Sequence, residues 1–169
     1  MKVNLLRLLD KNVYKVEVCN ELDTKELKIG TRTLKITKPI IVQGNVYKAD
    51  EGYYINFNII CEYRENCNRC LKEFTNKLET VLSGRLIEKS QNIENQDDDE
   101  TLIYFEGDNV YLEEPVITSV LLALPMKELC SEKCKGLCPT CGVNLNTEKC
   151  SCEVDDIDPR LAKLKELLD

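Results

Sequence analysis

The chain has 169 residues, of which 43% are hydrophobic and 31% are charged, and it carries a net charge of −7 with no histidine. This balance is typical of a globular protein with one core-bearing domain and a small additional module. The lack of histidine removes the commonest general base and the commonest ligand of catalytic zinc, so we do not expect an enzyme.

The N-terminal half alternates between apolar and polar residues, which is typical of strands that bury one face in a sheet. Met1–Asp10 is short and amphipathic, and its pattern fits either a strand or one helical turn. Val13–Cys19 predicts a half-buried strand with Tyr14 on the apolar face and Cys19 on the polar face. Cys19 is therefore expected to be an incidental thiol and not a metal ligand.

Two pairs of strands are expected next. Leu27–Ile29 and Leu34–Ile36 are brief alternating segments that can pair with each other. Ile40–Tyr47 and Tyr53–Cys61 flank a polar turn that contains glycine, and together they predict a β-hairpin. Cys61 shares the apolar face of its strand, so we expect a core thiol there.

The middle of the chain is expected to return to the sheet and then to add one helix. Phe74–Ile87 predicts a further strand, and Ser90–Glu100 predicts an acidic loop without a packing role. Thr101–Phe105 and Asn109–Leu112 are short strand candidates. A helix should follow, with two acids and a proline in its first turn and an apolar stripe that faces the sheet: Val116, Ile117, Val120, Leu121 and Leu124.

The negative charge is concentrated in one segment. Residues 94–114 contain nine acids and no Lys or Arg, which leaves 23 basic and 21 acidic residues elsewhere. A basic face can therefore exist outside that segment. Four basic residues near the first cysteine pair are candidate RNA contacts, although an ordinary solvated surface is the simpler interpretation: Arg64, Arg69, Lys72 and Arg85.

The spacing of the cysteines is the strongest signal in the sequence. Six of the ten cysteines fall between residues 130 and 152, and a further pair lies at Cys67 and Cys70. Thiolates at such spacings are the ligands that a tetrahedral zinc ion requires. Gly142, which directly follows the Cys138–Cys141 pair, can adopt the positive φ that lets backbone N–H groups approach the sulfurs.

We expect two zinc sites, and an all-thiolate site with no open position is structural. The first site is a zinc ribbon in which an extended return strand points its last two thiols the same way, with four ligands: Cys138, Cys141, Cys150 and Cys152. The second site uses the remaining thiols, and a helical turn over residues 130–135 would bring two of them onto one face: Cys67, Cys70, Cys130 and Cys134.

Two uses of the cysteines other than structural zinc sites have to be weighed. A secreted disulfide scaffold is disfavoured because the N-terminus lacks the pattern of a signal peptide, and no apolar run is long enough to span a membrane. We therefore expect a cytoplasmic protein with reduced thiols. The cysteine count alone also fits a zinc-buffering or thiol redox-switch protein, which stays open as the alternative function.

The sequence predicts an α+β fold with two parts. Residues 1–125 form a β-rich domain, a partly barrel-like antiparallel sheet with one packed helix and the acidic loop 90–100. Residues 126–169 form a zinc-binding module in which metal replaces a core that so short a segment cannot build. A C-terminal helix should begin at Asp158, and its leucine stripe must dock on this chain or on a partner: Leu161, Leu164, Leu167 and Leu168.

The order of these motifs resembles the YceD family, in its zinc-ribbon-containing bacterial type. The motifs are Cys-x-Arg-Cys-Leu at 67–71, an acidic connector, an apolar helix that ends at Leu122–Pro125, Cys-x3-Cys-x-Gly-Leu-Cys-Pro-x-Cys-Gly at 130–142, Asn-Leu-Asn at 144–146, Cys-x-Cys at 150–152 and Asp-Pro-Arg at 158–160. The resemblance covers about the whole chain, and its motifs are specific from Cys67 onward.

The resemblance implies a non-enzymatic factor needed for the accumulation of 23S rRNA and the assembly of the large ribosomal subunit. The implied partners are pre-ribosomal RNA or a large-subunit ribosomal protein, without a membrane or a small-molecule substrate. The family is also associated with a small zinc-ribbon protein of that subunit.

Overall fold

The chain forms two compact units in the computed structural model, which describes all residues except 11, 31, 51, 91–100 and 153–169. The sheet unit consists of Met1–Glu65 and Phe74–Met126. The cysteine unit consists of Asn66–Glu73 and Lys127–Asp169. The residues of the expected C-terminal helix lie outside the described residues, and so does most of the expected acidic loop.

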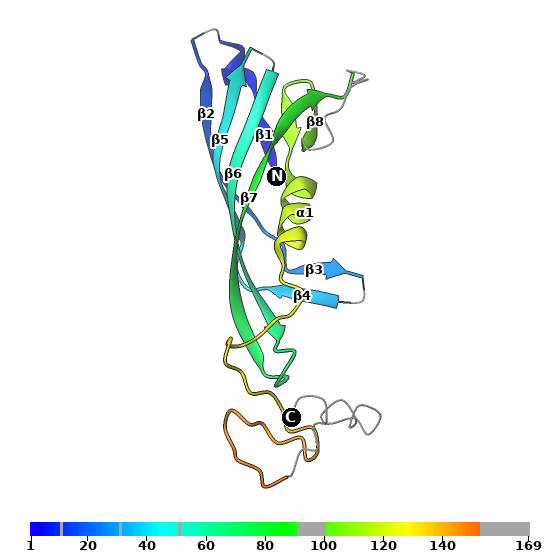
Figure 1. Ribbon diagram of the computed structural model, residues 1–169. Helices are drawn as coiled ribbons and strands as arrows, with labels where there is room; N and C mark the ends of the chain where they lie inside the picture. The colour runs from blue at the N-terminus through cyan, green and yellow to red at the C-terminus, as the bar shows by residue number, and fades with distance from the viewer. Residues whose placement is uncertain (11, 31, 51, 91–100, 153–169) are drawn as a thin grey trace, which may run out of the picture. The chain divides into compact units, whose positions relative to one another are not determined.

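One mixed sheet of nine strands dominates the sheet unit (Figure 1). Its strands are β1 (Lys2–Asn4), β2 (Lys15–Leu22), β3 (Glu26–Ile29), β4 (Arg32–Ile36), β5 (Ile40–Ala49), β6 (Gly52–Asn66), β7 (Glu73–Glu88), β8 (Leu102–Glu106) and β9 (Asn109–Tyr111). The main path runs β1-β9-β8-β7-β6-β4-β3, while β5 pairs with β6 and β2 pairs with β5. The sheet curls along its length (Figure 1). The fold is mostly strands, as the sequence predicts.

The hairpin of β5 and β6 forms as the alternating pattern predicts, with Ala49 opposite Gly52 at its tip. β3 and β4 also pair with each other, as expected. Gly44 is required on β5 because a Cβ there would overlap the carbonyl of Asn56 on β6. The sequence expectation of an antiparallel sheet is wrong at one place, since β7 and β8 run parallel, with Arg85 opposite Leu102.

The N-terminus contains both of the alternatives that its pattern allowed. Lys2–Asn4 pairs antiparallel with β9, and a 3-10 helix, η1 (Leu6–Leu9), follows directly. Tyr14 departs from the expectation of a buried side chain, because it precedes the first residue of β2 and is 67% exposed. The inward face of β2 is instead continued by Leu22, which is buried.

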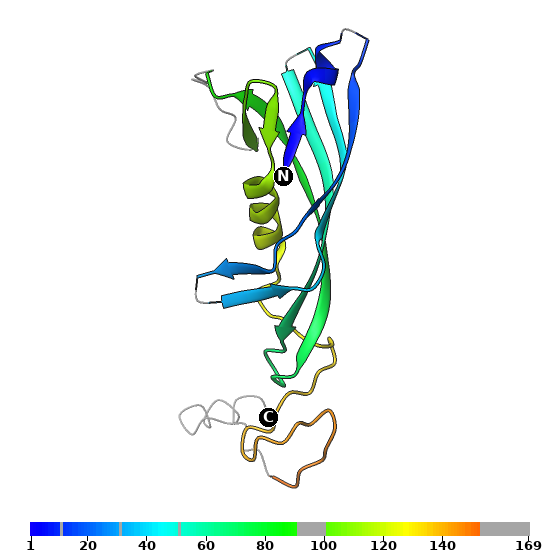
Figure 2. The same ribbon diagram turned by 180° about the vertical axis from the view of Figure 1, so that it is seen from behind.

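The helix α1 (Glu113–Ala123) lies against one face of the sheet, as the views from both sides show (Figures 1 and 2). Glu113 and Glu114 occupy its first turn, where the partial positive charge of the helix terminus favours acids. Leu124 is extended, as a residue before proline should be. Val116 and Val120 are buried in the same core as Phe57, so the predicted stripe packs on the sheet.

Two further expectations concern single features of the unit. Cys61 is fully buried in this core, as predicted, and burial raises the pKa of its thiol to about 11. None of the described helices is long and apolar enough to cross a membrane.

Candidate metal centre

Eight cysteines of the cysteine unit gather in two groups of four. The sulfurs within each group lie within 4.8 Å of one another. The first site contains Cys138, Cys141, Cys150 and Cys152, and the second contains Cys67, Cys70, Cys130 and Cys134. The structure thus brings together the same sets of thiols that the sequence spacing groups, and it leaves Cys19 and Cys61 outside both.

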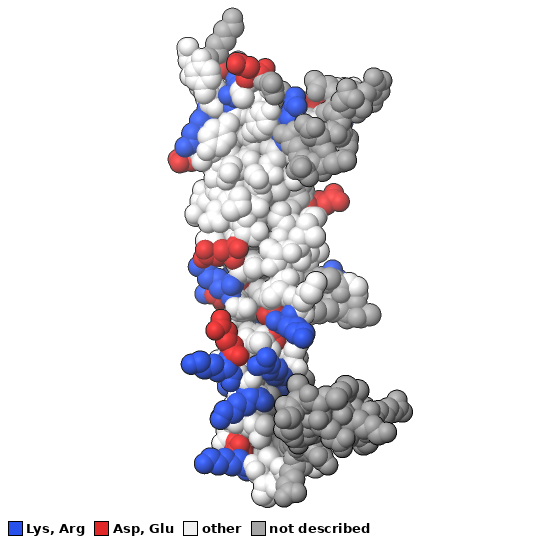
Figure 3. Space-filling model, in the orientation of Figure 1, with Lys and Arg blue, Asp and Glu red and all other residues white. Residues whose placement is uncertain are grey.

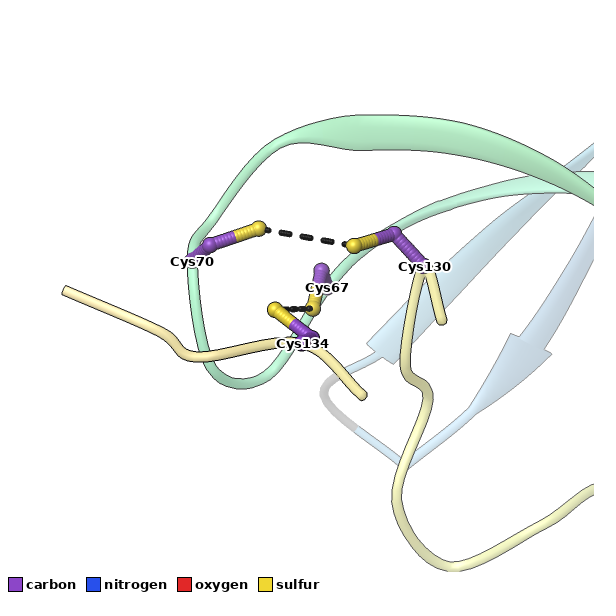
Figure 4. Close-up of side chains that lie close together, drawn as sticks. All are labelled: Cys67, Cys70, Cys130 and Cys134. Atoms are coloured by element: carbon purple, nitrogen blue, oxygen red, sulfur yellow. Dashed lines mark hydrogen bonds between the residues drawn. The ribbon is translucent and has the colours of Figure 1, made fainter. Parts of the chain in front are cut away.

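The sulfur positions of the second site fit a tetrahedral zinc ion. An ion with Zn–S bonds of about 2.3 Å separates its sulfurs by about 3.8 Å along each edge of the tetrahedron. The sulfur atoms of Cys67 and Cys134 are 3.8 Å apart, and those of Cys70 and Cys130 are 3.6 Å apart (Figure 4). The side chains point toward a common centre from two segments of the chain, so four thiolates can reach one ion.

Each site is built on a tight turn between two cysteines. At the first site, the Gly142 N–H donates to the Cys138 carbonyl at 2.9 Å. At the second site, the Leu71 N–H donates to the Cys67 carbonyl, also at 2.9 Å. Gly142 has a φ of 73° and Leu71 a φ of 57°, so the two turns share one backbone shape.

The other two cysteines of each site do not lie in the secondary structure that the sequence predicts. Residues 130–135 do not form a helical turn; a tighter turn closes instead, with the Cys134 N–H donating to the Ser131 carbonyl at 3.0 Å. This turn is sufficient for metal binding, because it still brings the sulfurs of Cys130 and Cys134 to the same site. Cys150 and Cys152 belong to no strand within the described residues, although their sulfurs still converge on the first site.

Arg69 ties together the two segments of the second site. Its guanidinium donates to the Cys134 carbonyl at 2.9 Å and to the Glu132 carbonyl at 3.4 Å. The Arg69 carbonyl accepts the Leu137 N–H at 3.1 Å. Arg69, which the sequence suggested as an RNA contact, therefore has a structural role within the cysteine unit.

The thiols of the second site divide into two that ionise readily and two that do not. Burial raises the pKa of Cys67, but backbone N–H groups at Cys130, Cys70 and Arg69 outweigh burial and lower this pKa to about 6. The pKa of Cys134 is also lowered, because the Gly136 N–H and the Asn146 amide outweigh its burial.

The other two thiols of this site hold their protons more strongly. Burial and the neighbouring cysteines raise the pKa of Cys130 to about 12. The Lys72 N–H favours the Cys70 thiolate, yet burial and the thiols of Cys67 and Cys134 leave the pKa of Cys70 raised. A metal ion must therefore displace protons from Cys70 and Cys130 when it binds.

The first site shows the same division and is more open to solvent. The backbone N–H groups of Cys141 and Thr140 lower the pKa of Cys138 to about 6. The hydrogen bond with Cys141, followed by burial, raises the pKa of Cys152 to about 12. Cys138 is buried, but Cys141 is exposed, whereas three of the four thiols at the second site are buried.

The four candidate RNA contacts do not all lie in one unit. Arg69 and Lys72 belong to the cysteine unit, and both are exposed. Arg64 and Arg85 lie on β6 and β7 of the sheet unit, where Arg64 is exposed and Arg85 is half-buried.

The sequence did not predict a hollow of about 840 Å³ in the sheet unit. It is lined by α1, by residues 80–83 of β7 and by residues 101–104. Leu122, which lines it, is 82% exposed. One feature of the sequence could have indicated this hollow: Leu122 is apolar but lies outside the stripe that α1 turns toward the core.

Comparison with known proteins gives relatives but no structural counterpart. An uncharacterized protein of Mycobacterium tuberculosis is 29% identical over 123 residues, which cover 73% of this chain and 59% of the relative. An uncharacterized protein of Mycobacterium leprae is 25% identical over 130 residues, which cover 77% of this chain and 59% of that protein. The chain thus spans about three fifths of the length of these relatives. No solved structure matches it.

The fold and the site define a class of protein: a curled β-sheet with one packed helix, joined to a cysteine-rich unit whose two groups of four thiols are compatible with metal binding. The sequence model of one family matches residues 55–168, a range that contains all eight of these thiols. The chain belongs to this family, YceD, described as the large ribosomal RNA subunit accumulation protein. The resemblance seen in the motifs is thereby confirmed.

Proposed function

We propose that this protein is a non-enzymatic ribosome biogenesis factor that is needed for the accumulation of 23S rRNA and the assembly of the large ribosomal subunit. Two zinc ions would hold the cysteine unit as a rigid scaffold that binds pre-ribosomal RNA or a large-subunit ribosomal protein. The observation that carries the proposal is the family match over residues 55–168, which spans both groups of thiols. A cytoplasmic location, without a membrane or a small-molecule substrate, follows from this role.

The charge of the cysteine unit supports contact with RNA. Among its described residues, six exposed side chains are basic and three are acidic, and one face of this unit is visible in Figure 3. The basic residues are Arg69, Lys72, Lys127, Lys133, Lys135 and Lys149. Lysine and arginine side chains bind phosphates, whereas the −2 charge of the second zinc site would lie on four thiolates of which three are buried.

Lys72 is the most informative of the four candidate RNA contacts to replace. Its backbone carbonyl accepts the Cys67 N–H at 2.9 Å, a bond that survives a change of side chain. Arg69 is less suitable because its guanidinium holds the second site together. Lys28, an exposed lysine on β3 of the sheet unit, provides a matched control.

The experiment compares Lys72→Glu with Lys28→Glu in a strain that lacks the chromosomal copy. We expect Lys72→Glu to keep its zinc but to restore less of the large-subunit rRNA than either the wild type or Lys28→Glu. Full restoration of the rRNA by Lys72→Glu would show that the side chain of Lys72 does not contribute to the proposed RNA contact. Failure of the wild-type protein to affect large-subunit rRNA would contradict the proposed function as a whole.

The two kinds of partner are separated by a pull-down at increasing salt. A bound RNA should be released steeply as salt rises, because phosphate contacts displace condensed counterions. It should also disappear after ribonuclease treatment. A ribosomal protein that stays bound after that treatment would instead favour the protein partner.

The zinc-buffering or thiol redox-switch function is favoured by one observation, the exposure of Cys141 at the first site. An exposed thiolate ligand is open to peroxide and to competing chelators. Under this alternative, dilute peroxide should release one zinc ion per chain within minutes, from the first site. Retention of both ions would argue against the switch and in favour of a structural scaffold.

A further inference from the structure

Asn146 lies in the loop between the two halves of the first site, yet its side chain contacts a thiol of the second. Its Nδ2 donates to the Cys134 Sγ at 3.4 Å. Its Oδ1 accepts the N–H of the next residue along, Lys135, at 2.8 Å. One amide therefore joins the loop of one site to a ligand of the other.

The orientation of this amide is fixed by a further residue of the same loop. Asn144 Oδ1 accepts both the backbone N–H of Asn146 at 3.0 Å and its Nδ2 at 2.7 Å. The two N–H bonds of the Asn146 amide thus point to Asn144 and to Cys134, while its oxygen faces Lys135. Only an amide satisfies donors and acceptors in this arrangement.

The loop is held by the short connector between the two sites, residues 135–137, and by the first cysteine that follows it. The Leu145 N–H donates to the Gly136 carbonyl at 3.0 Å, and the Cys138 N–H donates to the Val143 carbonyl at 2.8 Å. Leu137 and Asn144 also form an isolated β-bridge. The loop that closes the first site therefore forms together with the connector that leaves the second.

We propose that Asn146 is a positioning residue that couples the two sites, so that metal in the first site tightens metal binding in the second. Metal at the first site joins the two ends of the loop, which places the Asn146 amide against Cys134. An N–H donor beside a thiolate ligand offsets part of the negative charge that four thiolates leave on a zinc site. Coupling of two binding equilibria is reciprocal, so metal in the second site must tighten the first equally.

This inference rests on the metal binding within the proposed function but not on the ribosomal role. A purely local role for Asn146, in which it only shapes its own loop, predicts a different result. In that case its replacement would weaken the first site and would leave the second unchanged.

The test is a double-mutant cycle on the full chain, measured as zinc affinity of the second site by competition with a chelator. Asn146→Ala is combined with Cys138→Ser/Cys141→Ser, which disables the first site. Disabling the first site should weaken the second about 10- to 100-fold, the usual range for loss of an outer-shell partner. Asn146→Ala should weaken it similarly, and the combined variant should be no weaker than either. Additive losses, or an unchanged second site in Asn146→Ala, would overturn the coupling.

Two further variants separate the donor from the rest of the loop. Asn146→Asp keeps an oxygen for the Lys135 N–H but has no N–H for Cys134, so the coupling should be lost. Thr147→Val removes a loop hydrogen bond to the Asn144 carbonyl at 3.2 Å without touching a thiol, so the coupling should remain. If Asn146→Asp behaves like the wild type, the N–H···S bond carries no coupling.

A spectroscopic measurement covers the case in which a variant fails to fold. In wild-type protein loaded with cadmium-113, the Asn146 side-chain amide proton should show scalar coupling to the metal of the second site through sulfur. Absence of that coupling in a fully loaded protein contradicts the contact. Failure to bind any metal contradicts the proposed zinc sites instead, so the two failures are distinguishable.

Discussion

Leu71 and Gly142 occupy equivalent positions in two matching turns. Each directly follows the second cysteine of a Cys-x-x-Cys pair, and each donates its N–H to the carbonyl of the first cysteine at 2.9 Å. Their φ angles are 57° and 73°. Glycine adopts this conformation freely, whereas leucine is strained in it by about 1–2 kcal/mol. Leu71 is also 67% exposed, so no packing offsets the strain.

Leu71→Gly should therefore keep the metal and leave the zinc-loaded protein as stable or up to about 1 kcal/mol more stable. Relief of strain is partly offset by the greater freedom of glycine in the unfolded chain, which costs about 0.5–1 kcal/mol. Thermal unfolding of the loaded protein measures the difference. The reverse change, Gly142→Leu, adds the same strain and removes the same unfolded-state freedom, so it should destabilise by up to about 1 kcal/mol. Destabilisation by both changes would mean that Leu71 makes a contact that its exposure does not suggest.

Removal of metal should unfold the cysteine unit and leave the sheet unit intact. The buried apolar side chains among the described residues of the cysteine unit are all cysteines: Cys67, Cys70, Cys134 and Cys138. Without an ion these thiols supply little apolar burial, so metal binding supplies most of the folding free energy. Limited proteolysis with a strong chelator should cut within residues 127–152 and spare the strands. Equal proteolysis of that segment with and without chelator would show that it folds without metal.

Cys61 should make the sheet unit less stable at high pH. Burial raises the pKa of this thiol to about 11, while in the unfolded chain it titrates near its ordinary value of about 8.5. Between these values the folded state holds the proton and the unfolded state releases it, so stability is fully present below about pH 8.5 and falls toward pH 11. Cys61→Ala should lose this part of the pH dependence.

The measurement is urea unfolding of both proteins at several values between pH 8 and pH 11. Every other ionisable group is the same in both proteins, so the difference between the two curves isolates Cys61. Parallel curves throughout this range would contradict a buried neutral thiol.

The sequence predicts those elements that depend on neighbours along the chain. The hairpin of β5 and β6 follows from alternation around one turn, and α1 follows from its acidic first turn and its stripe around Val116 and Val120. The grouping of the cysteines follows from spacing, because each Cys-x-x-Cys turn holds two sulfurs near one ion.

The remaining features depend on contacts between distant segments, which local patterns do not encode. β7 pairs with β8 in parallel, and no alternation of residues distinguishes this pairing from an antiparallel one. The sequence places Asn146 in the loop of the first site, but it does not predict the contact of its amide with Cys134 of the second site. Tyr14 follows the alternating pattern but lies before the strand begins.

Metal content tests the central claim most directly, namely that eight cysteines form two zinc sites. Zinc per chain should be measured in the wild type, in Cys67→Ser and in Cys19→Ser, whose exposed thiol lies outside both groups. We expect two zinc ions in the wild type and in Cys19→Ser, and about one in Cys67→Ser. One zinc ion in all three proteins would leave Cys67 without a metal and would contradict the second site.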